Sequence, residues 1–169
     1  MFFPMIATIV ILLIIVGVMS SSPILAENYD LQMRFGKIKN TYRIEQAIVN
    51  SVEAFCQLDP DTCLENENDG IIDLTVGDLS GYISSNFVND NLFGGYYTIK
   101  VVDNYSTIRL LTAIPNNYDR SLYLHHYLAN ATGIPTLCSS GSETSVPACD
   151  DSGVFHDFPT SLNFRAALN

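Results

Sequence analysis

The chain has 169 residues, and about 140 of them follow an apolar opening, which is enough for one domain with its own core. Eight Lys and Arg residues stand against 18 Asp and Glu residues, so the formal net charge is -10. An acidic surface repels the phosphate backbone of nucleic acids, and these numbers therefore argue against a nucleic-acid partner.

The first 26 residues are apolar. No charged residue comes before Glu27, and Thr8 is the only polar side chain before Ser20. A membrane-spanning helix needs about 20 mostly apolar residues, which this stretch supplies. We therefore predict that residues 1–26 form a helix that spans a membrane.

A cleaved secretory signal is the alternative for this opening. Such signals carry a basic n-region, a short apolar core and small residues at the cleavage site. The opening has no Lys or Arg, its apolar run is long, and the site before Glu27 reads Ile24-Leu25-Ala26, with a bulky residue where a small one is favoured. These departures favour the membrane span.

An amphipathic helix is predicted over residues 27–55. Its apolar residues recur at steps of three or four, or of seven across Glu45: Leu31, Phe35, Ile38, Tyr42, Val49, Val52 and Phe55. The opposite face carries Arg34, Lys37, Asn40, Arg43 and Asn50. Together with the opening this predicts one helix from near the N-terminus to about Phe55, on the order of 80 Å long.

The four cysteines form two close pairs, for which we predict the disulfides Cys56–Cys63 and Cys138–Cys149. Zinc is the alternative, but neither pair has the short gap of zinc ligands and no histidine lies at ligand spacing beside them. Disulfides indicate an oxidising compartment. The positive-inside tendency alone would keep Arg34 to Arg43 in the cytoplasm. A short basic leader, removed from in front of Met1, would resolve this conflict, so we expect a processed chain.

Residues 57–73 read as an acidic loop with turns at Pro60 and Gly70. The stretch ENENDG at 65–70 echoes the start of a calcium loop, although its first two ligand positions are Glu and Val76 stands where the closing acid belongs. We predict a solvated loop, and calcium bound by acidic residues within 59–73 stays open as the alternative. The candidate ligands are Asp59, Asp61, Glu65, Glu67, Asp69 and Asp73.

The remaining chain predicts a small mixed domain. Residues 74–87 indicate a short helix or turn with Leu79, Tyr82 and Ile83 inward. Residues 96–114 indicate a β-hairpin that turns at Asp103-Asn104. Residues 116–133 read as a helix that ends at Gly133, with Leu122, His125–His126 and Ala129 marking one side. A disulfide-bounded loop at 138–149 and a last strand within 153–164 follow.

We predict no catalytic, cofactor-binding or metal site, and hence no enzyme. The only histidines are His125, His126 and His156. Adjacent residues on a helix point about 100° apart, so His125 and His126 cannot share a metal as a pair four residues apart would. No phosphate-binding loop, nucleophile elbow or HExxH motif occurs in the sequence.

The order of these features resembles the type IV pilin and pseudopilin superfamily. The resemblance runs along most of the chain and rests on four stretches. They are the apolar opening with Pro23 about one span-length in, then TYRIEQAIVNSVEAFC, DLSGYISSNFVNDNLFGGYYTIKV and CSSGSETSVPAC. The last three resemble the second half of the pilin spine helix, the short helix and turn before a Tyr-led strand, and the C-terminal disulfide-bounded loop.

The resemblance implies an α+β fold in three parts: an apolar half-helix at 1–26, an amphipathic half-helix at 27–55, and a globular head at 56–169 with an antiparallel sheet and a disulfide-bounded loop. It implies a structural subunit of an extracellular pilus filament, stored in the inner membrane. The implied partners are further copies or other pilins, the pilus assembly machinery and prepilin peptidase, and surface adhesion is an implied role.

One position departs from the family pattern. Pilins usually have a glutamate at the fifth mature residue, where it meets the N-terminal amine of a neighbouring subunit. Here that place is held by Met5, with Pro4 before it and Thr8 the nearest polar group. The departure suits a tip or minor subunit, or a filament whose register is set by apolar packing.

A monomeric, membrane-anchored periplasmic binding domain is the alternative function. It explains a membrane span and disulfides, whereas it leaves the continuous amphipathic helix without a purpose. Deletion of residues 1–28 separates the two, because a binding domain would keep its ligand and a pilin would lose all assembly.

Overall fold

In the computed structural model the backbone is described for residues 3–84, 87, 90–130, 134–140, 148–149, 151–160 and 162. Side chains are described from Ala26 onward, apart from residues 85–86, 88–89, 126–134, 140–148, 150, 161 and 163–169. The chain divides into two compact units, residues 1–37 and 38–169, and α1 (Phe3–Leu58) runs through both. The statements below concern these described residues.

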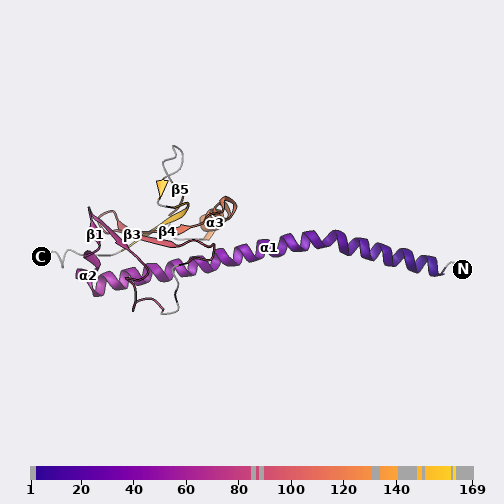
Figure 1. The fold of residues 1–169 in the computed structure, drawn as a ribbon, viewed down its shortest axis with the longest axis horizontal. Coiled ribbons are helices and arrows are strands. Elements are labelled where there is room, and N and C mark those ends of the chain that lie inside the picture. Colours follow the sequence, from indigo (N-terminus) through magenta and orange to yellow (C-terminus); the bar gives the residue numbers. More distant parts are fainter. Residues whose placement is uncertain are drawn as a thin grey trace. The chain divides into compact units, whose positions relative to one another are not determined.

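The fold is α+β, as predicted (Figure 1). After α1 come α2 (Pro60–Leu64), β1 (Glu67–Asn68), β2 (Ile71–Leu74), β3 (Tyr97–Val102), β4 (Thr107–Ala113), α3 (Asn117–Asn130), β5 (Ile134–Ser140), β6 (Ala148–Cys149) and β7 (Gly153–Pro159). The prediction of one long N-terminal helix is confirmed, and the helix ends at Leu58, just beyond the expected Phe55.

The predicted membrane span at 1–26 falls almost wholly on residues whose side chains are outside the description. Within the part of the chain that the structure describes, no helix is long and apolar enough to cross a membrane.

The second unit is built on one seven-stranded sheet in the order β1-β2-β3-β4-β7-β5-β6. Its pairs are antiparallel except β5 with β6, which is parallel. Side chains alternate between buried and half-buried along most of β3 and β7, as expected for a sheet covered on one face. The β3–β4 hairpin confirms the prediction for 96–114, and Asp103, Asn104 and Tyr105 all adopt positive φ at its turn.

The core of the second unit lies between the sheet and the part of α1 that begins at Ile38. Figure 1 shows β3 and β4 running beside this part of the helix. Removing each of these large side chains from water contributes about 1.5–3 kcal/mol. The principal contributors are Ile48, Val49, Val52 and Phe55 from α1, Ile72 and Leu74 from β2, Ile99 and Val101 from β3, and Ile108 and Leu110 from β4.

A second buried group joins α1, the sheet and α3. Ile38, Ile114, Tyr123 and Val154 pack together, with Leu122 half-buried against them. The predicted helix over 116–133 is confirmed as α3, which packs on β5 and β7. The expected inward face was incomplete, because among the described side chains of α3 Tyr123 is fully buried, whereas His125 is exposed. The side chains of His126 and Ala129 lie outside the described ones. Gly133, the expected end of this helix, lies outside the described residues.

The structure contains both predicted disulfides, Cys56–Cys63 and Cys138–Cys149. The zinc alternative is wrong, because all four sulfurs are paired with one another. The first bridge ties the end of α1 to α2. The second joins β5 to β6.

One local prediction was wrong. Residues 59–74 form α2 and the β1–β2 hairpin instead of an open loop, because Asp69 and Gly70 both adopt the positive φ of a tight hairpin turn. The expected short helix or turn over 74–87 is present as hydrogen-bonded turns within residues 74–84, with Leu79 buried as expected. The ends of the predicted loop 138–149 belong to β5 and β6, and β5 pairs along β7 from Ile134 to Cys138. The last strand is confirmed as β7.

Candidate functional site

Residues 26–37 of α1, the exposed segment, carry large apolar side chains in contact with water. Tyr29 is 66% exposed, Met33 52% and Phe35 42%. Tyr29 and Met33 are four residues apart, so they lie next to each other on one face of the helix. In this segment only Leu31 and Arg34 are half-buried, and the other side chains are exposed. Large apolar side chains exposed on one helix segment make this segment a candidate site of interaction with another molecule.

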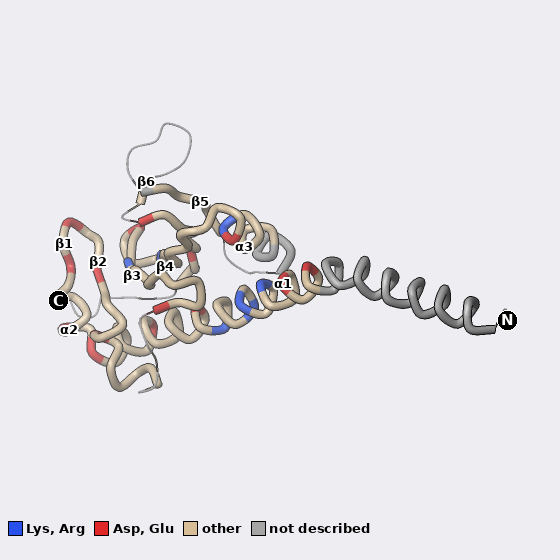
Figure 2. The backbone as a smooth tube through the Cα atoms, turned by 45° about the vertical axis from the view of Figure 1, so that its right-hand side comes forward, with Lys and Arg blue, Asp and Glu red and all other residues tan. Residues whose placement is uncertain are grey.

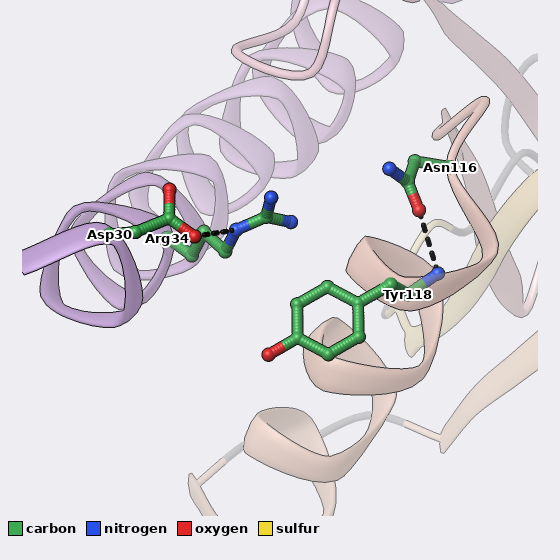
Figure 3. A network of polar contacts seen from close by, with 4 residues as sticks. All are labelled: Asp30, Arg34, Asn116 and Tyr118. Atoms are coloured by element: carbon green, nitrogen blue, oxygen red, sulfur yellow. Dashed lines mark hydrogen bonds and ion pairs between the residues drawn. The ribbon is translucent and has the colours of Figure 1, made fainter. Parts of the chain in front are cut away.

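The exposed segment also begins a run of positive charge. Asp30 and Arg34 form an ion pair along the helix, with 2.8 Å between Arg34 Nε and Asp30 Oδ2 (Figure 3). Arg34, Lys37, Lys39 and Arg43 then follow with no acidic residue among them. By contrast, residues 44–99 contain ten Asp and Glu residues and no Lys or Arg. Figure 2 shows a run of basic residues along α1, and acidic residues on β1 and β2.

A buried polar cluster lies in the second unit, where α1, β4, α3 and β7 meet. It consists of Glu45, Thr112, Tyr123 and His156, whose exposed fractions are all 0%. Glu45 Oε1 accepts hydrogen bonds from the hydroxyls of Thr112 and Tyr123. Glu45 Oε2 lies 3.5 Å from His156 Nδ1. One carboxylate thus joins four elements through polar contacts.

The charge of Glu45 also acts on two tyrosines. Burial raises the pKa of Tyr123 well above its ordinary value, and the negative charge of Glu45 and the hydrogen bond to it raise this pKa further. Burial also raises the pKa of Tyr97, on β3, and the charge of Glu45 adds to the effect. Both phenols therefore keep their protons at neutral pH, so Tyr123 can donate its hydroxyl proton to Glu45.

The start of α3 is fixed by a cap that holds Tyr123 in position. Asn116 Oδ1 accepts a hydrogen bond from the backbone N–H of Tyr118 at 2.8 Å (Figure 3). The Asn116 carbonyl accepts from the N–H of Arg120 at 2.9 Å. These contacts satisfy donors of the first helical turn, a role for which Asn is favoured. The helix therefore begins in a defined register, and its seventh residue, Tyr123, points into the core.

Sequence reasoning missed the buried cluster, although a signal for it was present. Glu45 stands between Tyr42 and Val49 at the spacing of the apolar stripe on α1, so an acidic residue on a buried face could have been noticed. His156 lies on β7 between Val154 and Phe158, both of which are buried, and alternation along the strand places it inward. The structure keeps it apart from His125, whose side chain is exposed on α3.

The predicted calcium alternative at 59–73 stays a prediction. In the turn of the β1–β2 hairpin, the Glu67 carboxylate accepts from the N–H of Gly70 at 2.5 Å, and Asp59 caps α2 by accepting from Thr62 N–H. Among the residues described, no group of three or more His, Cys, Asp or Glu side chains is arranged to hold a metal ion.

The buried cluster acts within the fold, since its four side chains are closed to solvent. The exposed segment of α1 is the candidate site for interaction with other molecules. Comparison of the chain with protein-family models, with curated proteins and with solved structures finds no match.

Proposed function

We propose that the chain is a structural subunit of a type IV pilus or a pilus-like filament. The observation that carries the proposal is the exposed segment of α1, where Tyr29, Met33 and Phe35 stand on a long helix that continues into an α+β head. A helix that served only as a tether would be expected to present polar side chains here. This one presents an apolar surface that a second copy of the chain can cover.

Assembly replaces one set of apolar contacts by another. Before assembly, the apolar opening of α1 is held in the inner membrane, where a helix satisfies its own backbone hydrogen bonds. An assembly machine then extracts the subunit, and its helix packs against the helices of neighbouring copies. Van der Waals contacts supply cohesion in place of lipid. Copies related by a screw operation make heterologous contacts that do not close, which gives a filament.

The distribution of charge supports contacts between copies. A net charge of -10 makes identical subunits repel one another unless opposite charges face each other. The basic run from Arg34 to Arg43 and the acidic residues 44–99 are separate regions of the chain. A heterologous contact can bring the first region of one copy against the second region of its neighbour, which lowers this repulsion.

The head then faces the medium and gives the filament its surface properties, including adhesion. Its two disulfides stabilise a small domain, each by about 2–4 kcal/mol. Processing by a prepilin peptidase and storage in the inner membrane precede assembly. The position of Met5 suits a tip or minor subunit or a filament aligned by apolar packing.

The test is to place charge on the exposed segment. Tyr29→Asp together with Met33→Asp should abolish the chain's presence in filaments sheared from producing cells, as judged by a denaturing gel of the sheared fraction. Tyr118→Asp is the matched control, because Tyr118 is 52% exposed on α3, and we expect it to leave the sheared fraction unchanged.

The amount of chain in the membrane fraction and the integrity of both disulfides must be equal in all variants. Unchanged filaments in the double variant would contradict the proposal. So would wild-type chain that is found only in membrane or soluble fractions, which is the result expected of a monomeric anchored binding domain.

A further inference from the structure

The turn of the β3–β4 hairpin carries a sequence motif that filament assembly does not use. Residues 104–106 are Asn104, Tyr105 and Ser106, and an Asn followed two positions later by Ser or Thr is the acceptor pattern for transfer of a glycan to asparagine. A second match begins at Asn130, the last residue of α3. A motif of three residues is common, so its structural surroundings decide whether it can act.

The hairpin presents the first and third residues of the motif to solvent. Pairing between β3 and β4 stops at Val102 and Thr107, so residues 103–106 form the turn. The side chains of Asn104 and Ser106 are exposed, whereas Tyr105 between them is half-buried and packs against the core of the second unit. The middle residue therefore anchors the turn, and the two residues that a glycosyltransferase has to recognise remain accessible.

The backbone of the turn suits an asparagine at the acceptor position. Asp103, Asn104 and Tyr105 have φ values of 56°, 53° and 64°. Asn and Asp tolerate this left-handed region better than most residues with a side chain. Within the described chain residues 103–106 lie outside the paired residues of the strands. A transferase can thus reach this backbone without separating two strands.

The hydrogen bonds that close the turn leave the acceptor amide unused. Ser106 Oγ donates to the Asp103 carbonyl at 2.7 Å, and the Ser106 carbonyl accepts from the N–H of Thr160 at 2.9 Å. Among the described residues none forms a hydrogen bond with the side chain of Asn104. A group attached to Asn104 Nδ2 therefore breaks no contact of the fold. The Ser106 hydroxyl still has lone pairs with which to accept a hydrogen bond from an enzyme.

We propose that Asn104 is the acceptor of an N-linked glycan, donated by an oligosaccharide that is linked to a polyprenyl pyrophosphate. Asn104 Nδ2 forms a bond to the anomeric carbon of the first sugar, while the bond from that carbon to the pyrophosphate oxygen breaks. The lipid pyrophosphate leaves, and the proton lost by Nδ2 passes to a base of the transferase. Nothing is oxidised or reduced in this step.

The two disulfides of the chain fit the same location. They indicate an oxidising compartment, and asparagine-linked glycans belong to the surfaces of secreted proteins. The glycan is bulky and solubilising, so it would extend the polar surface of the head beyond this turn. The inference does not rest on the proposed function, because an anchored binding domain with the same head would carry the same glycan.

The first test uses the wild-type chain, purified from the cells in which it naturally occurs. Trypsin cuts after Lys100 and Arg109, so the peptide 101–109 contains the whole motif, whereas the match at Asn130 falls in the separate peptide 121–165. Mass spectrometry with fragmentation should find peptide 101–109 with a glycan on Asn104. The proposal is overturned if this peptide occurs only in its bare form, or if peptide 121–165 alone carries a glycan.

Substitutions within the motif separate glycan transfer from a role in the turn alone. Asn104→Asp keeps a residue that tolerates positive φ and removes the acceptor amide, and Ser106→Ala removes the hydroxyl. Both should abolish the glycan on peptide 101–109, whereas Ser106→Thr should retain it. Asn130→Gln is the matched control and should also retain it. If the residues served only to form the turn, none of these variants would lose a glycan, and that result would contradict the proposal.

A reconstituted reaction tests whether the folded turn is the acceptor. The full chain, produced without a transferase and kept in detergent with both disulfides intact, is incubated with membranes that contain an oligosaccharyltransferase and its lipid-linked oligosaccharide. We expect peptide 101–109 to gain the glycan in this folded sample, because Asn104 and Ser106 are exposed. Transfer to Asn104 only after reduction and denaturation would show that the folded turn is closed to the enzyme, and would overturn the inference.

Discussion

Two stretches of the same helix differ in what covers them. In the exposed segment, residues 26–37 of α1, Tyr29 and Met33 are more than half exposed. Further along, Thr41, Glu45, Ile48 and Val52 recur at steps of three or four residues, and all are 0% exposed. Both stretches contain apolar residues at helical spacing, and among the described residues only the second contributes to a buried core cluster.

The difference teaches that hydrophobic periodicity predicts a helix face without predicting what covers it. Phe35 and Val52 belong to one predicted stripe, yet Phe35 is 42% exposed and Val52 is buried. Among the described residues, the members of the stripe that belong to a buried core cluster lie from Ile38 onward. The proposed assembly offers lipid, and later another copy, as the partner of the exposed apolar residues before Ile38.

The largest expected effect comes from truncating one residue in each stretch. Ile48→Ala should lower the free energy of unfolding of the head by about 2–5 kcal/mol, since it leaves a cavity in the core. Met33→Ala should change it by less than about 0.5 kcal/mol, since Met33 is 52% exposed. Urea unfolding of the full chain in detergent, followed by tyrosine circular dichroism, measures both.

Equal losses of stability in Ile48→Ala and Met33→Ala would contradict the difference between the two stretches of α1. In that case the exposed segment would be packed inside the monomer, and its surface would not be available to a second copy. If Met33→Ala leaves stability unchanged but reduces filament yield, the two stretches serve the separate purposes inferred here.

Loss of the Cys56–Cys63 disulfide, near the end of α1, should have the next largest effect on stability. Cys56 and Cys63 close a loop with a sequence separation of 7. Replacing both by Ser should cost about 2–3 kcal/mol, because the unfolded chain regains the freedom that a short closed loop denies it. Both sulfurs are buried, so the hydroxyls add some desolvation cost.

Thermal unfolding of the Cys56→Ser, Cys63→Ser double variant against wild type checks this value, and the same comparison under reducing conditions, which open both disulfides, is the control. A difference between the two chains that disappears after reduction would assign the effect to the Cys56–Cys63 bond itself. An unchanged melting temperature would show that α2 and the end of α1 are held together by their packing alone.

The elements themselves follow largely from the sequence. The stripe from Ile38 to Phe55, the β3–β4 hairpin, α3, β7 and both disulfide pairings could all be predicted, because each depends on local periodicity or on short spacing. The β1–β2 hairpin is a different case. Its turn residues Asp69-Gly70 favour a hairpin, but the many carboxylates around them read as a solvated loop, and pairing with β3 decides the outcome.

The sequence does not predict contacts between residues that lie far apart along the chain. Glu45 meets Thr112, Tyr123 and His156 only when four elements come together. No local pattern joins these positions. A single Glu within an apolar stripe fits a buried polar residue and a break in the buried face equally well. Strand β5 was not predicted for the same reason, since it forms only by pairing with β7, which lies later in the chain.

The smallest expected effects come from the ion pairs of the two units. Arg109 and Asp157 face each other on neighbouring strands through two hydrogen bonds of 2.7 and 2.9 Å, and the Arg109 guanidinium carbon lies 4.6 Å from the centre of the Phe155 ring. Asp30 and Arg34 form one contact along an exposed helix. Asp157→Asn should therefore cost about 1 kcal/mol, and Asp30→Asn about 0.2–0.5 kcal/mol.

Unfolding of the head should register the first change and not the second, since Asp30 belongs to the other unit. The cost of Asp30→Asn should instead appear as faster amide hydrogen exchange near residue 30. Added salt should reduce both costs, because the charges are partly exposed and screened. If Asp30→Asn destabilised the head as much as Asp157→Asn, the exposed segment would be part of the same cooperative unit. The comparison between the two stretches of α1 would then have to be abandoned.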